Sequence, residues 1–385
     1  MVDDQLGLGD LLAAVEKASP VRSLEVVARN LRERFGARSV SLLLPDVVGQ
    51  RMVRVGGDVE SQQGGSADQV PLHGSVYHDV LRSQQVTRVP GDGAGERVIA
   101  PVTNRGDTIG VLELTLSDAA DDVLEQVGEA AHALAYIVVT DRRFTDLYHW
   151  GKRTTQMTLA AEIQRQLLPT ASCCTENEFT VAGALVPADS IGGDTYDFTL
   201  DQETLHMSIT DAMGHDIKSA LLATIVVNAS RRARRAGCDL AEQARQMHEA
   251  ILEHGSHGLA TGQLVRVALD GSGCQLVNAG HPWPLRLRDG RVDELRLDID
   301  LPFGVPSPAP HRVQEIDVRA GDRLVLYTDG MQERRARGVD LAAMLRDSAA
   351  EHAREVVETM TSAVSVACHG HLEDDASILC LDWRA

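Results

Sequence analysis

The sequence predicts an α+β protein with more than one domain. Its 385 residues suffice for two or three domains that each bury a core. Strand-forming runs separated by short polar turns occur in pairs, as at Tyr196–Leu200 with Leu205–Thr210 and within Arg97–Leu116. Stretches with helical periodicity, such as Leu11–Phe35 and Ile217–Arg235, stand between the strand pairs.

The composition is that of a globular protein that does not bind nucleic acid. The chain is 43% hydrophobic and 24% charged, as globular proteins are, and its net charge of −19 argues against a nucleic-acid partner. The basic run Arg231–Arg235 ends the helix predicted at 217–235, and we interpret it as a solvated helix terminus. That helix is expected to pack on a sheet through one stripe: Ile217, Ala220, Leu221, Thr224, Ile225 and Asn228.

The cellular compartment is predicted from what the sequence lacks. None of the six cysteines stands in a C-x-x-C motif, so reduced thiols are expected. No signal peptide opens the chain, and no apolar run approaches the roughly 18 residues of a membrane span. We therefore expect a cytoplasmic protein that contacts neither membrane nor nucleic acid.

Two aspartates are predicted to face each other at the end of a hairpin. A turn at Asp201–Thr204 and pairing of Leu200 with Leu205 would place Asp194 opposite Asp211. Opposed residues of an antiparallel pair point to the same face, with Cα atoms about 4.5–5.5 Å apart. Like charges at that separation repel unless a proton or a cation intervenes. A divalent cation would relieve the repulsion; the alternative is an acidic hairpin end exposed to water.

A second pair of acids favours the cation. One predicted strand, 323–328, runs into Asp329, and another, 376–381, follows Asp374 and Asp375 directly. Antiparallel pairing would bring Asp329 and Asp374 to the same edge; Asp375 is the alternative, because a predicted strand start varies by a residue or two. Four carboxylates suit Mg²⁺ or Mn²⁺ better than zinc. The sequence thus predicts a centre for two metal ions.

Six motifs in order carry a family resemblance. They are IGGDTYDF (191–198), DAMGHD (211–216), NAGHPWPLRL (278–287), LPFG (301–304), GDRLVLYTDGMQE (321–333) and DDASILCL (374–381). Together they resemble the metal-dependent serine/threonine phosphatases of the PPM group, and its bacterial SpoIIE-type or RsbU-type branch in particular. The resemblance runs from about residue 160 to the C-terminus and implies a four-layer αββα sandwich.

The resemblance and the predicted pairings imply a metal-dependent protein serine/threonine phosphatase. Asp211 would bridge two Mn²⁺ or Mg²⁺ ions, with the Ala212 carbonyl as a further ligand. Asp194 would hold one ion, and Asp329 and Asp374 the other. A water shared by both cations would attack phosphorus without a phosphoenzyme. The resemblance also supplies the substrate, a phosphoserine or phosphothreonine on a protein, expected to be a STAS-type anti-anti-sigma factor.

Other polar residues near the motifs have secondary roles. His215 and His281 are candidate general acids, although His281 fits a structural role in its turn better. Asp197 is expected to support the hairpin rather than to bind metal. Thr195 and Asp216 depart from the family pattern, which commonly has an aromatic residue and a glycine there.

Residues 1–140 are expected to form a separate α+β domain. The strand pair within Arg97–Leu116 resembles the closing hairpin of a GAF domain, a sensor module, which would regulate the phosphatase. The alternative is a small domain that only dimerises. Scattered histidines and no Cys/His cluster leave its ligand unnamed.

A connector, residues 141–170, is expected to precede a phosphatase domain at 171–385. Ala161–Pro169 resembles the helix that leads into SpoIIE-type catalytic domains, and we interpret it as a transmission helix; the alternative is an ordinary amphipathic linker. Heptad spacing just before the connector favours a helix packed on the sensor or on its twin in a homodimer: Leu124, Val127, Ala131, Leu134 and Val138.

Two rival functions stay open at this point. A His-Asp pair such as His215–Asp216 also forms the metal-binding core of HD-type phosphohydrolases, but those proteins are all-helical and here a predicted strand precedes the pair. The second rival is a catalytically silent scaffold, a GAF dimer whose phosphatase-like half only binds a partner. Loss of an acid would support that scaffold, yet all four acids are present.

Overall fold

A computed structural model describes residues 8–46, 49–55, 68–91, 95–150, 158–188, 192–214, 217–255 and 257–385. The chain divides into two compact units, Met1–Gln156 and Met157–Ala385, and the boundary falls inside the predicted connector. Within the described ranges, no helix has both the length and the apolar character needed to cross a bilayer.

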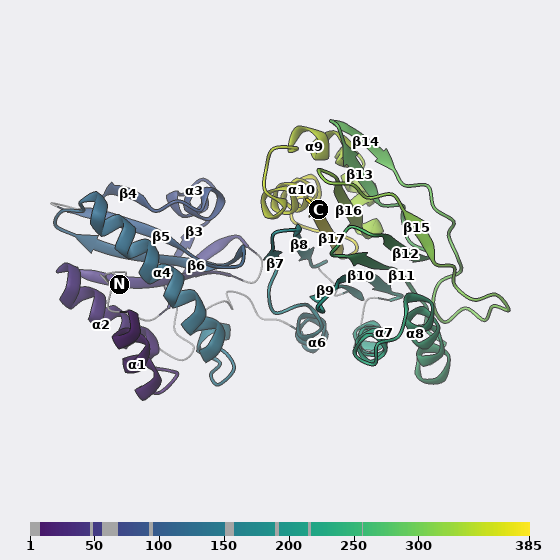
Figure 1. The fold of residues 1–385 in the computed structure, drawn as a ribbon, viewed down its shortest axis with the longest axis horizontal. Helices are drawn as coiled ribbons and strands as arrows, with labels where there is room; N and C mark the ends of the chain where they lie inside the picture. The colour runs from purple at the N-terminus through teal and green to yellow at the C-terminus, as the bar shows by residue number, and fades with distance from the viewer. Residues whose placement is uncertain are drawn as a thin grey trace. The chain divides into compact units, whose positions relative to one another are not determined.

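The first unit is a six-stranded antiparallel sheet with helices on both faces (Figure 1). The strand order is β3-β2-β1-β6-β5-β4. The strands are β1 (Ser39–Pro45), β2 (Arg51–Val55), β3 (Gln69–Pro71), β4 (Thr87–Pro90), β5 (Glu96–Asn104) and β6 (Asp107–Leu116). The helices are α1 (Leu8–Lys17), α2 (Ser23–Phe35), α3 (Val76–Ser83), α4 (Asp121–Asp141) and α5 (Leu147–Trp150).

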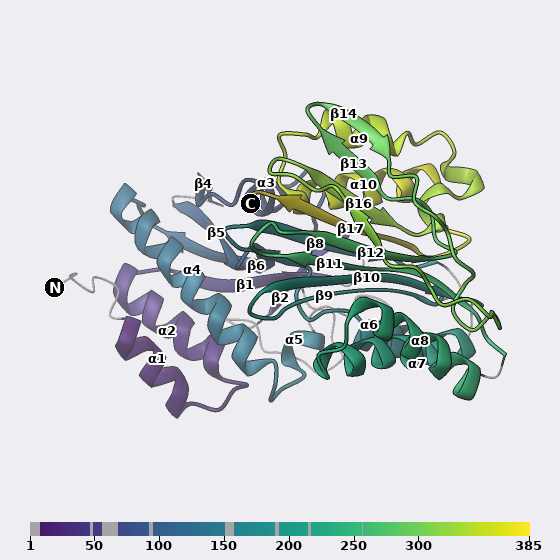
Figure 2. The ribbon, with the colours of Figure 1, turned by 45° about the vertical axis from the view of Figure 1, so that its right-hand side comes forward.

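Helix α4 packs on its own sheet. Figure 2 shows it lying along the sheet on the same side as α1 and α2. The predicted heptad residues Val127, Ala131, Leu134 and Val138 are buried in one core with strand residues such as Leu112. Of the two partners that the heptad spacing left open, these side chains therefore contact the sheet of their own unit.

One predicted helix of this unit is two helices. The stretch 11–35 was expected to be continuous, but α1 ends at Lys17 and α2 begins at Ser23. Pro20 lies in the break, and proline disfavours helical backbone in the residue before it. Helix α3 begins after Ser75, whose side chain caps it by accepting a hydrogen bond from the backbone of His78.

The second unit contains two antiparallel sheets. The five-stranded sheet has the order β15-β12-β11-β10-β9 and the six-stranded sheet the order β14-β13-β16-β17-β8-β7. The strands are β7 (Cys173–Thr175), β8 (Phe179–Val186), β9 (Asp194–Leu200), β10 (Thr204–Ala212), β11 (Ala260–Ala268), β12 (Cys274–Ala279), β13 (Leu285–Arg288), β14 (Arg291–Glu294), β15 (Gln314–Ile316), β16 (Arg323–Tyr327) and β17 (Ala376–Trp383). The helices are α6 (Leu159–Leu167), α7 (Ile217–Arg235), α8 (Leu240–His254), α9 (Leu341–Asp347), α10 (Ala353–Ala367) and two 3₁₀ turns, Asp329–Gln332 and Arg334–Ala336.

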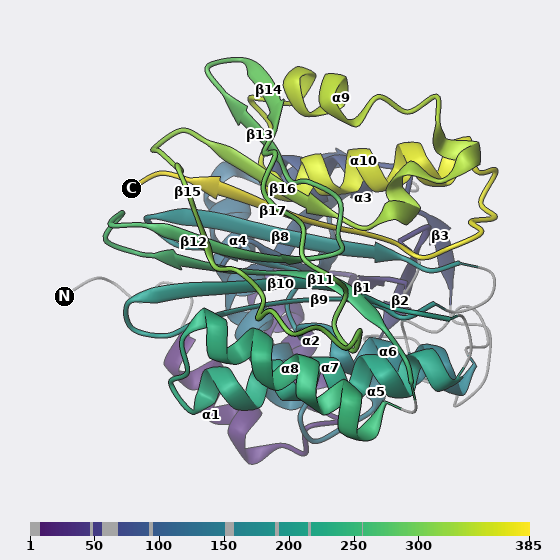
Figure 3. The same ribbon diagram turned by 90° about the vertical axis from the view of Figure 1, so that its right-hand side faces the viewer.

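The two sheets of this unit share one apolar core. Residues of both sheets, such as Ile209 and Leu379, are buried in it together. Helices α7 and α8 cover the outer face of the five-stranded sheet, and α9 and α10 that of the six-stranded sheet (Figure 3). Because the two sheets face each other across this core, strand ends from both sheets can bring together residues that are far apart in the sequence.

The predicted packing stripe of α7 is wrong for most of its residues, although Ala220 is buried as predicted. The helix has its predicted bounds, but Ile217 and Leu221 are 43% and 51% exposed. The buried face is instead built around Ala223, Val226 and Val227. Helix α7 lies between α6 and α8 and also contacts the sheet, so three neighbours rather than one decide which side faces solvent.

Candidate metal centre

The hairpin of β9 and β10 has the predicted register. Leu205 pairs with Leu200, and at the other end Asp211 pairs with Asp194. Asp194 is only 2% exposed, so this carboxylate has almost no water with which to share its charge. The prediction that the two aspartates stand opposite each other is confirmed.

The six-stranded sheet brings further carboxylates to the same end. Strands β16 and β17 pair antiparallel, so that Asp329, which follows β16, lies at the edge where Asp374 precedes β17. The hydroxyl of Thr328 donates a 2.7 Å hydrogen bond to Oδ2 of Asp194, which joins the two sheets at this point. The backbone N–H of Ser377 in turn donates to the Thr328 hydroxyl.

The charges at this end of the unit repel one another. Burial raises the pKa of Asp211 to about 7, and the negative charges of Asp329, Asp374 and Asp375 add to the effect. Burial likewise raises the pKa of Asp194 well above its usual value, with contributions from Asp211 and Asp375. Carboxylates in this state are stabilised by protons or by cations.

Asp374 and Asp375 differ in their partners. Asp375 accepts a 2.8 Å hydrogen bond from the backbone of Ala188 at one oxygen and a 2.5 Å bond from the side chain of Gln164 at the other. Asp374 accepts one bond, from the backbone of Asp375, and is more exposed. Asp375 thus uses both oxygens to hold the fold, whereas Asp374 keeps one available for a ligand.

Two glycines allow the backbone to approach this cluster. A Cβ on Gly192 would stand 2.7 Å from a carboxylate oxygen of Asp375 and 3.2 Å from one of Asp374. A Cβ on Gly193 would stand 2.1 Å from the Ala212 carbonyl oxygen. The Ala212 carbonyl can therefore lie against the backbone of Gly193, which directly precedes Asp194, because Gly193 has no side chain.

The donor set fits Mn²⁺ or Mg²⁺ rather than a softer metal. It consists of carboxylates and one backbone carbonyl, all hard oxygen ligands. In the described part of this unit, no three Asp, Glu, His or Cys side chains offer ligand atoms within 4.8 Å of one another. A Mg²⁺ ion commonly uses one or two carboxylates and keeps several waters, so spread carboxylates suit it better than zinc.

His281 is built into its turn. Its backbone N–H donates to the side chain of Asn278, and its Nδ1 shares a 2.9 Å hydrogen bond with the hydroxyl of Thr261. Burial lowers the pKa of His281 to about 3, so the ring is neutral at neutral pH. This agrees with a structural role. The other candidate acid, His215, and its neighbour Asp216 lie outside the described residues.

Asp197 supports a helix rather than the hairpin. Its carboxylate pairs with Arg231 at 3.0 Å and with Arg234 at 3.2 Å. The interpretation of the basic run as a solvated terminus is therefore wrong for these two arginines, whose side chains are 18% and 13% exposed. They point inward because the carboxylate on β9 lies beneath the last turns of α7.

Two residues at the centre were assigned no role from the sequence. Thr328 holds Asp194, and Gln164 on α6 donates to both Asp375 and the backbone carbonyl of Asp194. Gln164 lies far from either aspartate in sequence, and no local pattern marks it. The one signal in the sequence is that Gln164 lies in the stretch 161–169, which resembles the helix that leads into SpoIIE-type catalytic domains.

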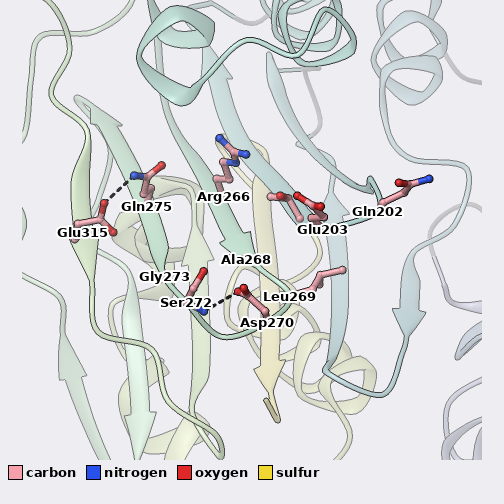
Figure 4. Close-up of a pocket in the computed structure, with 11 residues that line it drawn as sticks. Gln202, Glu203, Arg266, Ala268, Leu269, Asp270, Ser272, Gly273, Gln275 and Glu315 are labelled. Atoms are coloured by element: carbon pink, nitrogen blue, oxygen red, sulfur yellow. Dashed lines mark hydrogen bonds between the residues drawn. The ribbon is translucent and has the colours of Figure 1, made fainter.

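One cavity of this unit lies away from the carboxylates. A cavity of about 740 Å³ lies at the Gln202–Thr204 end of the hairpin, at the opposite end of β10 from Asp211 (Figure 4). Its polar side chains bond one another, as Gln275 does with Glu315 at 2.7 Å. We place the candidate site at the carboxylates, because that is where charges with raised pKa values converge.

Parts of this chain are similar to known proteins. Residues 201–384 match the family model described as Stage II sporulation protein E (SpoIIE). Phosphoserine phosphatase RsbU of Bacillus subtilis (strain 168) is 21% identical over 234 residues, which cover 59% of this chain and 69% of that protein.

Solved structures of lower similarity complete the comparison. The RsbU and RsbW domains of a Mycobacterium tuberculosis protein have a TM-score of 0.48 and 20% identity, and the match covers 57% of this chain and 62% of that one. The PP2C phosphatase domain with a fragment of the regulatory domain of SpoIIE from Bacillus subtilis has a TM-score of 0.47 and 13% identity, covering 78% and 83%.

The family match contains Asp211, Asp329 and Asp374, and Asp194 lies just before it. Residues 201–384 of this chain form a domain of the SpoIIE family.

Proposed function

We propose that this chain is a metal-dependent protein-serine/threonine phosphatase. One observation carries the proposal: carboxylates from two sheets converge at one end of the second unit, and the charges that act on Asp211 are all negative. Such an arrangement is unfavourable in a bare protein and favourable around divalent cations. The relative RsbU is named a phosphoserine phosphatase, which supports the same chemistry.

Each acid has a role in this proposal. Asp211, together with the Ala212 carbonyl, would help to hold both Mn²⁺ or Mg²⁺ ions, while Asp194 would hold one ion and Asp329 with Asp374 the other. When bound, the ions would supply a Lewis acid and a lowered pKa for bound water. The remaining work belongs to the chain: Thr328 fixes the rotamer of Asp194, and Asp375 fixes the segment that presents Asp374.

The architecture of this unit supports assignment to the four-layer αββα sandwich of the PPM phosphatases. Two sheets enclose one core, and helices cover each outer face. For the first unit we propose a GAF-like sensor domain, on the strength of a six-stranded antiparallel sheet that contains the predicted hairpin as β5–β6.

Helix α6 is the proposed transmission helix. Gln164 on this helix contacts the backbone of Asp194 and the carboxylate of Asp375 at once, so a rotation of α6 would change both. The helix lies directly after the boundary between the two units. The contact gives the first unit a physical route to the candidate metal centre, and a homodimer of the full chain is the setting in which we propose it operates.

The proposed substrate is a phosphoserine or phosphothreonine on a STAS-type anti-anti-sigma protein. The phosphoester class follows from the metal centre, whereas the STAS partner rests on the resemblance to the RsbU-type branch.

Hydrolysis of p-nitrophenyl phosphate tests the proposal. The parent should release phosphate only when Mn²⁺ or Mg²⁺ is present, and Asp211→Asn should abolish the release. Asp239→Asn is the matched control, because Asp239 caps α8 from the exposed surface and asparagine caps as well. A parent that is inactive with both metals and with a phosphorylated STAS protein would instead support a silent scaffold.

A further inference from the structure

The first unit contains a cavity that the phosphatase proposal does not use. Its volume is about 510 Å³, within the range of small-molecule sites. The cavity lies on the face of the sheet opposite α1, α2 and α4, beside the N-terminal end of α3. It is lined by Arg54, Val70, Ser75, Val76, Tyr77, Arg97, Glu113 and Thr115.

A buried carboxylate organises the polar side of this cavity. Glu113 on β6 is 7% exposed and accepts hydrogen bonds from Tyr77 at 2.6 Å, Arg97 at 2.7 Å and Arg54 at 3.2 Å. Nη2 of Arg97 also donates to the Tyr77 hydroxyl at 2.7 Å. Glu113 therefore has its acceptor capacity filled by protein groups, and it holds both guanidinium groups in fixed positions.

The lining of the cavity carries more positive charge than its buried carboxylate neutralises. Two guanidinium groups face one carboxylate, and Asp68, which pairs with Arg54 at 3.4 Å, is 63% exposed and therefore screened by solvent. Within the described residues, Nε and Nη1 of Arg97 have no protein acceptor, although the side chain is only 25% exposed. The unused charge and donors thus belong to Arg97.

Other groups around Arg97 suit an anion with a small organic body. Ser75–Tyr77 form the first turn of α3, and a helix N-terminus favours negative charge. Thr115 adds a hydroxyl, while Val70 and Val76 add apolar surface. A purely structural network would need one guanidinium to neutralise Glu113. The second guanidinium lines the cavity with two donors that have no acceptor among the described residues.

We propose that this cavity binds a small soluble molecule bearing a carboxylate or phosphate group, with Arg97 as the residue that pairs with the anion. Glu113 and Tyr77 act as positioning residues, since they hold the Arg97 guanidinium toward the cavity. The site belongs to the first unit and does not depend on the metal chemistry of the second.

Calorimetric titration of the full-length chain tests this site. The probes are succinate and inorganic phosphate, with uncharged succinamide for comparison, in buffer without divalent cations so that anions cannot bind through a metal. Arg97→Gln removes the pairing charge, and Val70→Trp fills the cavity while leaving every ion pair intact. Arg29→Gln, an exposed arginine on α2 across the sheet, is the matched control.

The parent should bind at least one anion saturably and leave succinamide unbound. Arg97→Gln should weaken that binding about tenfold or more, as expected for loss of a charge-assisted hydrogen bond. Val70→Trp should abolish it, and Arg29→Gln should leave it unchanged. The proposal would be overturned if neither anion bound saturably to the parent. It would also be overturned if binding survived Val70→Trp. This second variant keeps the proposal testable even if the Arg97→Gln protein fails to fold.

Discussion

Replacing Asp211 with asparagine should stabilise the metal-free protein while removing its response to metal. Burial and three neighbouring carboxylates raise the pKa of Asp211 from 3.8 to about 7 in the folded protein. A folded-state pKa above the unfolded value means that the folded state binds more protons between these pH values. The free energy of unfolding therefore falls as pH rises from about 4 to 7 and stays reduced above that range.

The size of this effect follows from the same pKa. Raising a pKa by one unit corresponds to about 1.4 kcal/mol, so ionisation of Asp211 destabilises the metal-free fold by about 4 kcal/mol at pH 8. Asparagine cannot ionise. At pH 8 the Asp211→Asn protein should thus unfold with a free energy up to about 4 kcal/mol higher than the parent, and near pH 4 the two should be alike.

Urea denaturation followed by tryptophan fluorescence measures the difference, because Trp283 and Trp383 both belong to the second unit. The measurements are made at pH 4 and pH 8 in chelator and are repeated with Mn²⁺, which should stabilise the parent far more than the variant. Asp239→Asn controls for the loss of a charge. An Asp211→Asn protein that is less stable than the parent at pH 8, or equally stabilised by Mn²⁺, would refute the reasoning.

Three further changes test other contacts. Gln164→Ala removes the donor of one Asp375 oxygen, so it should destabilise the second unit by about 1–3 kcal/mol and lower Mn²⁺-dependent hydrolysis, both measurable on one preparation. Gly193→Ala places a Cβ 2.1 Å from the carbonyl oxygen of Ala212, so the backbone there must shift and stabilisation by Mn²⁺ should be abolished. Gly273→Ala is the control and should keep that stabilisation, because the nearest atom to its Cβ, in the side chain of Glu315, is 3.7 Å away. Burial alone would raise the pKa of Glu113, but its hydrogen bonds and the arginine charges hold that pKa below 4.5. The stability that results is complete above pH 4.5 and is lost as pH falls through the folded pKa. Glu113→Gln should therefore unfold at a lower temperature than the parent at pH 7, and its unfolding temperature should not show the parent's loss of this stability at acid pH.

Local patterns predicted the elements that hold the candidate centre. Alternation of apolar residues and a polar turn fixed the β9–β10 register, because side chains of a strand alternate with period two and a slip by one residue would reverse them. The strands before Asp329 and after Asp374 followed from the same signal. By contrast, β8 and α8 had no counterpart among the predictions. Strand β8 packs apolar residues into the cores on both faces of its sheet, Ala182 on one face and Val181 on the other, so its apolar run lacks alternation.

Packing decisions could not be predicted in the same way. The face of α7 that is buried depends on α6, α8 and the sheet together, and the inward turn of Arg231 depends on Asp197 of another element. Likewise, the choice between Asp374 and Asp375 depends on Ala188 and Gln164, which are distant in the sequence.

The sequence by itself determined which acids stand at strand ends and which of them pair across a hairpin, because both depend on residues close together along the chain. The tertiary structure alone decided that the two pairs meet, that Thr328 and Gln164 hold them, and that Arg97 keeps free donors toward a cavity. Those outcomes depend on contacts between elements that are far apart in the chain. Only the folded state buries these polar groups, and burial strengthens the electrostatic interactions between them.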